Sequence, residues 1–513
     1  MIEDANAAHE IYMPDNKIDI LFVNQPSPDG DFIIRDINRS GRKTREHMIW
    51  PQTNLAWEAA VMRDAGFSVD VIDCMASRIS WEELEDLLHT LKPRYIVGNA
   101  ISTTLTSDMR LFFYGKSLGA TTIAHGPHMT DKPTDSMNQF PSVDFCIMNE
   151  AEEALKELIL EIEGGSTDFG HILGIAWRKG SEAVRNGKRP FIKDLSSLPS
   201  PAYDLLPLDK YYMPFFGNYV FIEAGRGCPY QCIYCRQTVM WQSKVRNRRA
   251  ELLFEEIKTL HTLGVEHVMF HHDTFTADRK MVMKLCGLII ESGIKVRWCC
   301  NTHVATVDEE LVQSMKNAGC WMIAPGFESA SQDILNNVKK SATVAQNREA
   351  ARIIHDAGIE VWGYFMFGNP GETHETIRQT IDMSKELPIT IANFSIASPY
   401  PGTEFHKQAK ENGWLVQKRG WEDFDQNYSP VVDYGHLKPE DIYRALKTAN
   451  REFFLRPKQI ARIVREMKDW RTLKSLMGIV VSYLKLFLGK EKVQKVVETR
   501  TARSGEIQDA ASL

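Results

Sequence analysis

Tyr219-Val-Phe-Ile222, Gly225-Arg-Gly227 and Cys228-Pro-Tyr-Gln-Cys232-Ile-Tyr-Cys235 follow one another in the middle of this chain. The first is an apolar run typical of a buried strand, the second is a turn, and the third holds three cysteines. Cubane iron–sulfur clusters are normally held by four thiolates, so three would leave one iron with an open position. A substrate or cosubstrate can bind at an open position on a metal. The spacing therefore predicts a catalytic metal centre with Cys228, Cys232 and Cys235 as ligands.

Zinc binding and disulfide formation are the alternatives for these cysteines. A structural zinc site would normally pair two C-x-x-C elements, and the sequence has no second C-x-x-C or H-x-x-x-H pair. Nine cysteines among 513 residues is a low, odd count, and no apolar stretch behind a basic N-terminus marks a secretory signal. We therefore expect a cytoplasmic chain with reduced thiols.

The composition is that of a globular enzyme with several domains. Hydrophobic residues make up 43% and charged residues 25% of the chain, and 513 residues are too many for one core. The formal net charge of −6 gives no overall attraction to nucleic acid, so we expect no nucleic-acid partner.

Strands and helices alternate from residue 18 to residue 165, after an N-terminal extension at 1–17. The pattern predicts strands at 18–23, 68–73, 95–99, 120–124 and 143–148. It predicts helices at 54–65 and after Ser80, where Glu83 has the spacing of a capping box. This alternation favours a five-stranded, doubly wound α/β domain, whose ligands bind beyond the carboxyl ends of the strands.

Small hydroxyl and glycine residues at those strand ends leave room for a large flat or amide-bearing ligand. No G-x-G-x-x-G turn is present, which disfavours a nicotinamide cofactor. The inserted stretch 35–47 carries five basic side chains. It could hold phosphate or carboxylate groups, or it could be a solvated loop.

Residues 166–215 are predicted to be a connector, because prolines and glycines interrupt them. A second βα alternation of about six strands then spans 216–403, and polar residues follow its strands, as in related βα barrels. Adjacent Cys299 and Cys300 are expected on opposite strand faces, so that they cannot share one metal ion. Residues 365–367 are expected in the core, and Glu372-Thr373 at a helix start.

Residues 404–513 are predicted to be mainly helical, with a polar tail at 501–513. The apolar run Met477–Leu488 has 12 residues, whereas a membrane-spanning helix needs about 20. We expect a core or partner helix there, with peripheral contact at a membrane surface as the alternative.

The C-x-x-x-C-x-x-C motif resembles the signature of the radical S-adenosylmethionine (SAM) superfamily. The resemblance implies a [4Fe-4S] cluster whose open iron chelates SAM, and a partial (β/α)6 barrel. By resemblance, Glu328 and Ser329 fall where the family contacts the aminoacyl and ribose parts of SAM. Asn301 lies at another such strand end, and Asp273 is a candidate for ribose or substrate.

The sheet domain placed before that motif looks like the cobalamin-binding domain of the cobalamin-dependent subclass. His125-Gly-Pro-His128 resembles its G-G-P-H turn, and Asn149-Glu-Ala-Glu152 resembles its G-E-G-E turn, with both glycines replaced. No D-x-H-x-x-G sequence is present, so a histidine ligand below cobalt is not expected at that position. The resemblance implies cobalamin-binding residues at the strand ends: Asn24, Pro26, Ser102, Thr103, Thr104, Gly126, Pro127, His128, Glu150 and Glu152.

These resemblances imply an enzyme that cleaves SAM to a 5′-deoxyadenosyl radical and methylates an unactivated carbon of a small-molecule, lipid or tetrapyrrole substrate. An electron donor such as flavodoxin or ferredoxin would be its partner. Trp50-Pro-Gln-Thr53 and Arg226-Gly-Cys-Pro229 also look like the anaerobic oxidative cyclase of magnesium-protoporphyrin monomethyl ester, which is the alternative chemistry. A non-catalytic cobalamin-binding protein is the alternative of another class.

Overall fold

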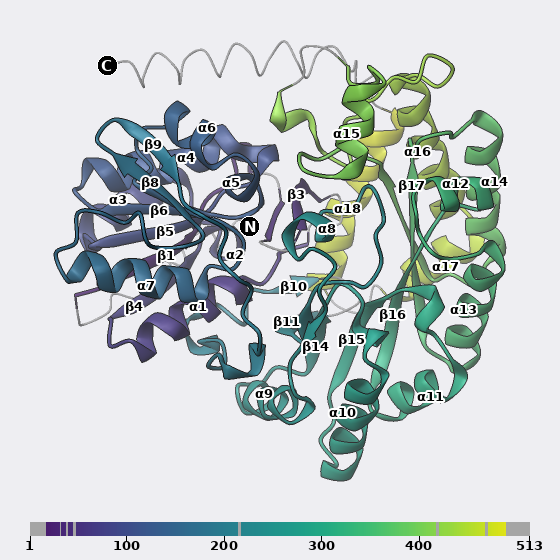
Figure 1. Cartoon of the computed structure of the whole chain (residues 1–513). Helices are drawn as coiled ribbons and strands as arrows, with labels where there is room; N and C mark the ends of the chain where they lie inside the picture. The colour runs from purple at the N-terminus through teal and green to yellow at the C-terminus, as the bar shows by residue number, and fades with distance from the viewer. Residues whose placement is uncertain are drawn as a thin grey trace, which may run out of the picture.

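The computed structural model describes residues 17–30, 32–36, 39–44, 48–213, 217–416, 420–466 and 470–488. Two seven-stranded sheets organise this part of the chain. In Figure 1 the first sheet and its helices lie on the left and the second sheet on the right. The predicted extension, except for Lys17, and the predicted polar tail lie outside the described residues.

The first sheet has five parallel strands in the flavodoxin-like order β4 (Val69–Asp73), β1 (Ile20–Asn24), β5 (Tyr95–Asn99), β6 (Thr121–His125) and β7 (Phe145–Ile147). This confirms the doubly wound sheet. Side chains alternate between its faces, so Ile20 and Phe22 join one core cluster while Leu21 and Val23 join another. Helices α1 (Thr53–Asp64) and α7 (Glu152–Glu163) contact each other on one face, and α3 (Trp81–Leu91) contacts α4 (Leu105–Ser117) on the other.

Local signals account for several of these elements. Ser80 caps α3 and Glu83 completes the predicted capping box. The sheet also gains an antiparallel hairpin, β8 (Ile175–Lys179) and β9 (Glu182–Arg185), which pairs with β7. This hairpin lies within the residues predicted to be an irregular connector. It forms because Gly180 takes a positive φ, which allows a tight turn between two short alternating runs.

A second hairpin, β2 (Ile33–Asp36) and β3 (Arg39–Lys43), lies between β1 and α1 in the chain. It contains part of the predicted basic stretch. Arg35 is fully buried, with its guanidinium 2.9 Å from Asp108 and hydrogen-bonded to the carbonyl oxygens of Gln25 and Pro26. Arg35 therefore does not bind phosphate, because its buried guanidinium is already paired with Asp108 inside the domain. Residues 37, 38 and 45–47 lie outside the described chain.

The second sheet runs β10 (Tyr212–Met213), β11 (Gly217–Glu223), β14 (His267–His271), β15 (Arg297–Thr302), β16 (Cys320–Glu328), β17 (Glu360–Phe367) and β18 (Ile391–Ile396). The last six are parallel, as predicted. Helices α9 (Ala250–Thr262), α10 (Arg279–Ser292), α11 (Glu309–Asn317), α13 (Val344–Asp356) and α14 (His374–Glu386) surround them (Figure 1). No pairing joins β18 to β11 in the described chain, so the barrel is partial.

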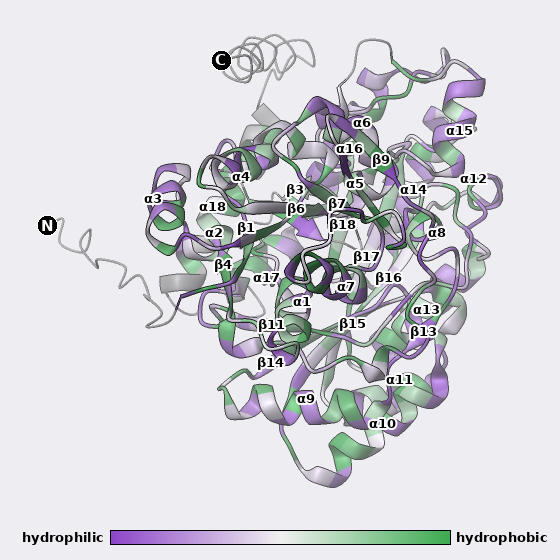
Figure 2. Cartoon of the chain, turned by 60° about the vertical axis from the view of Figure 1, so that its left-hand side comes forward, coloured by the Kyte–Doolittle hydropathy of each residue, from purple (hydrophilic) through white to green (hydrophobic). Residues whose placement is uncertain are grey.

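The strands of this barrel separate an inner and an outer core. Cys299 lies among the inward residues with Phe221, Met269 and Trp362, whereas Cys300 packs outward with the helices. The expectation that the two cysteines face opposite sides is thus confirmed. Figure 2 shows hydrophobic strands in both sheets and hydrophilic outer surfaces on helices such as α3 and α15 (Glu404–Glu411).

The C-terminal part is mainly helical, as predicted, with α16 (Pro439–Phe454), α17 (Pro457–Glu466) and α18 (Trp470–Leu488). Helix α16 contacts β18, and α17 and α18 both contact α16. The apolar run from Met477 forms the second half of α18. Among the described residues, no helix has both the length and the apolarity that crossing a bilayer requires.

The turn between β17 and α14 contains a buried carboxyl group. Thr373 caps α14, which confirms the predicted helix start. Glu372, one residue earlier, is fully buried and accepts hydrogen bonds from the backbone N–H groups of Gly368 and Asn369. Burial raises the pKa of Glu372 to about 8, although these two donors oppose the shift.

We expect this carboxyl group to make stability depend on pH. Its pKa is higher in the folded state, so its stabilising effect is complete below about pH 4.5 and is lost as pH rises through about 8. Relative to Glu372→Gln, the wild-type protein should lose about 2–3 kcal/mol of unfolding free energy between pH 6 and pH 9. Urea denaturation at both pH values measures this. Glu375→Gln, at an exposed position of α14, is the control and should show no such difference.

Candidate functional site

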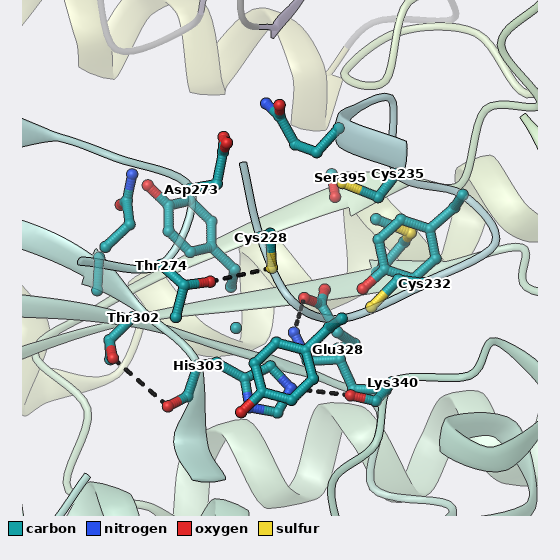
Figure 3. A pocket seen from close by; sticks show the side chains of 18 of the residues that line it. Cys228, Cys232, Cys235, Asp273, Thr274, Thr302, His303, Glu328, Lys340 and Ser395 are labelled. Atoms are coloured by element: carbon teal, nitrogen blue, oxygen red, sulfur yellow. Dashed lines mark hydrogen bonds and ion pairs between the residues drawn. The ribbon is translucent and has the colours of Figure 1, made fainter. Parts of the chain in front are cut away.

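The three cysteines of the motif line one cavity of about 270 Å³ at the carboxyl ends of the barrel strands. They lie on the loop that follows β11, and Figure 3 shows their sulfur atoms directed into a common space. The hydroxyl of Thr274 lies 3.1 Å from the Cys228 sulfur. Burial raises the pKa of all three thiols. A bound metal centre would reverse that effect, because a coordinating thiol loses its proton.

Polar groups from three neighbouring strands form the rim of this cavity. Asp273 follows β14, Asn301 lies near the end of β15, and Glu328 ends β16. Asp273 accepts a hydrogen bond from the Gly227 N–H, just before the first cysteine. Both amide atoms of Asn301 are buried without a partner in the described chain. Such a group is costly to bury unless a ligand completes its hydrogen bonds, so Asn301 is suited to bind one.

Lys340 is a charged member of the site that the sequence pattern did not reveal. Its Nζ lies 2.9 Å from Glu328 Oε1, and both side chains line the cavity (Figure 3). Burial opposes its charge, but the Glu328 carboxylate raises the pKa of Lys340 overall. The same ammonium group acts to lower the pKa of Cys232 against the larger effect of burial. Lys340 therefore places a positive charge beside thiols that would become negative on binding metal.

The backbone beneath this pair is constrained. Glu328 has a φ of +61°, and a Cβ at Gly326 would lie 2.5 Å from Glu328 Oε1 and 2.7 Å from Lys340 Nζ. A strained backbone in a charged cavity is typical of a functional site. Ser329, by contrast, is turned away from the cavity. Its hydroxyl lies 3.3 Å from that of Thr380 on α14 and accepts a hydrogen bond from the Ser331 N–H.

The carboxyl edge of the first sheet contains the residues predicted to bind cobalamin, and several already have partners. The side chain of Asn24 donates to Asp73, the hydroxyl of Thr104 donates to Asp108, and Ser102 lies 2.9 Å from His128 Nδ1. Pro26 contributes only a carbonyl oxygen, to Arg35, and Thr103 is buried. These residues lie together at one edge, as expected, but several of their polar groups are already hydrogen-bonded within the domain.

Unpartnered polar groups lie at the same edge. Asn99 ends β5, and both its amide atoms are buried without a partner in the described chain. The ring nitrogens of His125, at the end of β6, make no hydrogen bond within the described chain, although Nε2 lies 3.5 Å from Glu58 Oε2. Burial lowers the pKa of His125 to about 4, so its imidazole is neutral at pH 7, and burial also raises the pKa of the adjacent Glu58 well above its usual value. A Cβ at Gly126 would lie 2.1 Å from Asn99 Oδ1, so only glycine fits. The edge thus offers neutral hydrogen-bonding groups.

Glu150 and Glu152 hold the cysteine loop to the first sheet. Arg226, two residues before Cys228, lies 2.7 Å from Glu150 Oε1 and also pairs with Glu152 and Glu223. All four side chains are at least 95% buried. Although burial acts to raise it, the guanidinium lowers the pKa of Glu152 below its usual value. These two glutamates were predicted to bind cofactor. The structure directs them to an arginine instead, because a buried guanidinium needs carboxylate partners.

A second arginine fastens the other end of the loop. Arg236 follows Cys235 directly, donates to the Pro127 carbonyl oxygen at 2.9 Å and lies 2.7 Å from Asp131. The two turns of the first sheet that were predicted to contact a cofactor therefore hold the two ends of the cysteine loop. Neither arginine was assigned a role from sequence. Arg226 had a signal, since it stands between two glycines immediately before the cysteines.

Comparison with known proteins gives two family matches. The model described as Radical SAM superfamily matches residues 222–384, and the model described as B12 binding domain matches residues 47–159. The chain thus combines a radical SAM domain with a B12-binding domain, as cobalamin-dependent radical SAM enzymes do. The radical SAM domain implies a [4Fe-4S] cluster and SAM, and the B12-binding domain implies cobalamin.

Several proteins similar to this chain are named as methyltransferases or cyclases. An uncharacterized methyltransferase of Pyrococcus horikoshii is 29% identical over 439 residues, 84% of this chain and 94% of the relative. The anaerobic magnesium-protoporphyrin IX monomethyl ester cyclase of Cereibacter sphaeroides is 28% identical over 71% of this chain and 61% of the relative. The radical SAM methyltransferase TsrM of Kitasatospora setae is 15% identical, with a TM-score of 0.69 over 96% of this chain and 100% of that structure.

Both sites fit the cofactors that the family implies. Three thiols in one cavity are the donor set of a cluster with one open iron. The unpartnered amide of Asn301, with Asp273 and Glu328, suits the polar groups of SAM. The unpartnered amide of Asn99 and the neutral imidazole of His125 at the sheet edge suit an amide-bearing ligand such as cobalamin.

We expect removal of the Arg226 side chain to loosen the cysteine loop. Arg226→Met should leave the buried carboxyl groups of Glu152 and Glu223 without their guanidinium, whereas Glu150 keeps Arg246 at 2.7 Å, and should lower the unfolding free energy by about 3–5 kcal/mol. Arg63→Met is the matched control, because Arg63 and Asp204 form a pair that is 43% and 60% exposed, and its loss should cost less than about 1 kcal/mol. Urea denaturation of both variants measures this, and equal losses would contradict the assignment.

Proposed function

We propose that this protein methylates an unactivated carbon of a small organic substrate, with Cys228, Cys232 and Cys235 as the ligands of its cluster. One observation carries the proposal. The cysteine loop is fastened at both ends, through Arg226 and Arg236, to the edge of the B12-binding sheet. Bound together, the cluster and SAM supply a carbon-centred radical, and cobalamin supplies the transferable methyl group. The fastened loop holds the two cofactor sites at a fixed separation, as such a transfer requires.

The residues around the cysteine cavity have distinct roles in this proposal. Asn301, Asp273 and Glu328 bind polar groups of SAM, whereas Ser329 orients the backbone of its loop through Thr380. Lys340 holds Glu328 in place and offsets the negative charge of the thiolates. The sheet edge around Asn99 and Gly126 binds cobalamin, with Glu150 and Glu152 as positioning residues. An electron donor such as flavodoxin or ferredoxin reduces the cluster.

The domain boundaries are part of the proposal. We assign residues 18–185 to the cobalamin-binding domain, which now includes the β8–β9 hairpin, and 216–403 to the radical SAM barrel. The shorter connector is 186–215, and the C-terminal region is 404–513, whose described part is mainly helical. The match to the magnesium-protoporphyrin cyclase supports oxidative cyclisation of a tetrapyrrole as the second candidate.

Each of the three motif cysteines should be needed for iron binding. After anaerobic reconstitution, the wild-type protein should hold about four irons per chain and cleave SAM when reduced. Cys228→Ala, Cys232→Ala and Cys235→Ala should each abolish the cleavage. Cys286→Ala is the matched control, since Cys286 is buried among core residues of α10 and should keep both iron and cleavage. Iron analysis with product chromatography decides, and a motif variant that still cleaves SAM would remove the assignment.

The mass of the product separates methylation from cyclisation. A substrate incubated with the reconstituted enzyme, reductant, SAM and cobalamin should gain one CH₂ unit, and methyl-deuterated SAM should place its label there. A gain of oxygen or a new ring would establish the cyclase chemistry instead. Mass spectrometry of the product, with the Cys228→Ala enzyme as the blank, provides the measurement.

A further inference from the structure

A second cavity, of about 350 Å³, lies between the open side of the barrel and the C-terminal helices. One wall comes from β17 and β18, through Trp362 and Ile391. The opposite wall comes from α17 and α18, through residues such as Ile460, Ile479 and Tyr483. In Figure 1 α18 lies beside the barrel strands, close to β10. The volume is within the range of small-molecule sites. Neither family match includes these two helices.

The lining of this cavity favours a hydrocarbon ligand. Fourteen of its eighteen lining residues are aliphatic, aromatic or methionine. Of the four others, Arg462 lies 2.8 Å from Glu360 and so has its charge occupied, and Gln459 is 5% exposed. A ligand with polar groups along its length would lose hydrogen bonds to water without replacement. A continuous hydrocarbon chain meets no such cost.

The second cavity is continuous with the wall of the cysteine cavity. Asn393, in the middle of β18, lines both cavities. Two residues earlier, Ile391 lines the apolar cavity, and two residues later, Ser395 lines the cysteine cavity. Alternate residues of a strand share a face, so these three mark a path of roughly 13 Å along β18. A chain in the apolar cavity thus points toward the site where the radical chemistry takes place.

The exposed surface of the same helices is rich in apolar side chains and includes the exposed Lys458, Arg465 and Lys474. Seven of the twelve large hydrophobic side chains that are exposed in the described chain lie between Leu455 and Leu484, and five of these seven also line the cavity, so the cavity opens onto this surface. The sequence from 456 to 488 has eight basic residues and two acidic ones, although the whole chain has a net charge of −6. Exposed apolar side chains together with basic ones are typical of helices that lie on an anionic membrane surface.

We propose that the apolar cavity binds the hydrocarbon chain of a membrane lipid, taken up through α17 and α18 as they lie on the bilayer. The lipid chain lies along β18 with the carbon to be modified toward Asn393. The proposal of a lipid-binding site depends only on the cavity and on the exposed surface of α17 and α18. The statement that the bound lipid is the substrate rests on the proposed methyl transfer.

Two adjacent positions on α18 provide the test. Val480 lines the cavity and is 42% exposed, whereas its neighbour Val481 does not line it and is 48% exposed. The full chain, without reductant or SAM, is titrated with cis-parinaric acid, a fatty acid that fluoresces in apolar sites. Val480→Glu should weaken binding at least tenfold, and Val481→Glu should change it less than twofold. Thermal unfolding checks that both variants are folded.

Chain length gives a second readout of the same site. Saturated fatty acids that displace the probe should bind about fourfold more tightly for each added methylene group until the cavity is full. Sedimentation with phosphatidylcholine vesicles containing phosphatidylglycerol tests the source of the chain. Both glutamate variants should weaken vesicle binding, because both side chains belong to the outer surface.

The outcomes are distinguishable. Equal loss of probe binding in both variants, or no effect of chain length, would overturn the cavity and leave only a membrane-contact surface. Probe binding without vesicle binding would overturn the membrane as the source. If the lipid binds as predicted but gains no methyl group in the reconstituted enzyme that still cleaves SAM, its role as substrate falls while the binding site stands.

Discussion

The buried charge of Arg226 is the constraint around which the site is arranged. A guanidinium with almost no exposed surface must be neutralised where it lies, and Glu223 alone, three residues away on the same chain segment, does not suffice. Glu150 and Glu152 supply the remaining charge from a turn of the first sheet. The interaction gives little net stability by itself, since desolvation offsets much of it. Its effect is positional, because it joins the first sheet to the start of the cysteine loop.

That docking places the carboxyl edge of the first sheet against the cysteine loop. The arginine lies two residues before the first cysteine, and Arg236 lies directly after the last one. Each binds a turn at the carboxyl edge of the first sheet, so the cysteine loop follows that edge at both ends. Beside this contact, Asn99 and Asn301 are left with unpartnered amides on the two sides. Both amides are therefore available to bind a ligand.

Much of this arrangement could be predicted from the sequence. Periodicity and the caps at Ser80 and Thr373 located the strands and helices of both sheets. The cysteine motif and the polar residues after the strands located six of the residues that line the cysteine cavity. The roles of Glu150 and Glu152 could not be predicted, because an acidic turn looks the same whether it binds a ligand or an arginine 74 residues away. Lys340 was missed for the same reason. It is a loop lysine whose partner, Glu328, is identified only by the fold. The β8–β9 hairpin was hidden by the glycines and prolines around it.

The linings of the two cavities bear on the chemical character of the substrate. The inner face of β18 changes from Ile391 through Asn393 to Ser395, and so from hydrocarbon to hydrogen-bonding surface within five residues. A purely polar substrate would make no favourable contact with the Ile391 end of this face. A purely apolar substrate would offer no hydrogen-bonding partner to Asn393. The strand therefore matches a molecule with both characters, placed with its apolar part toward α17 and α18. Under the proposed lipid uptake, α17 and α18 would select the substrate at the open side of the partial barrel, while the fastened cysteine loop would hold the cluster that acts on it.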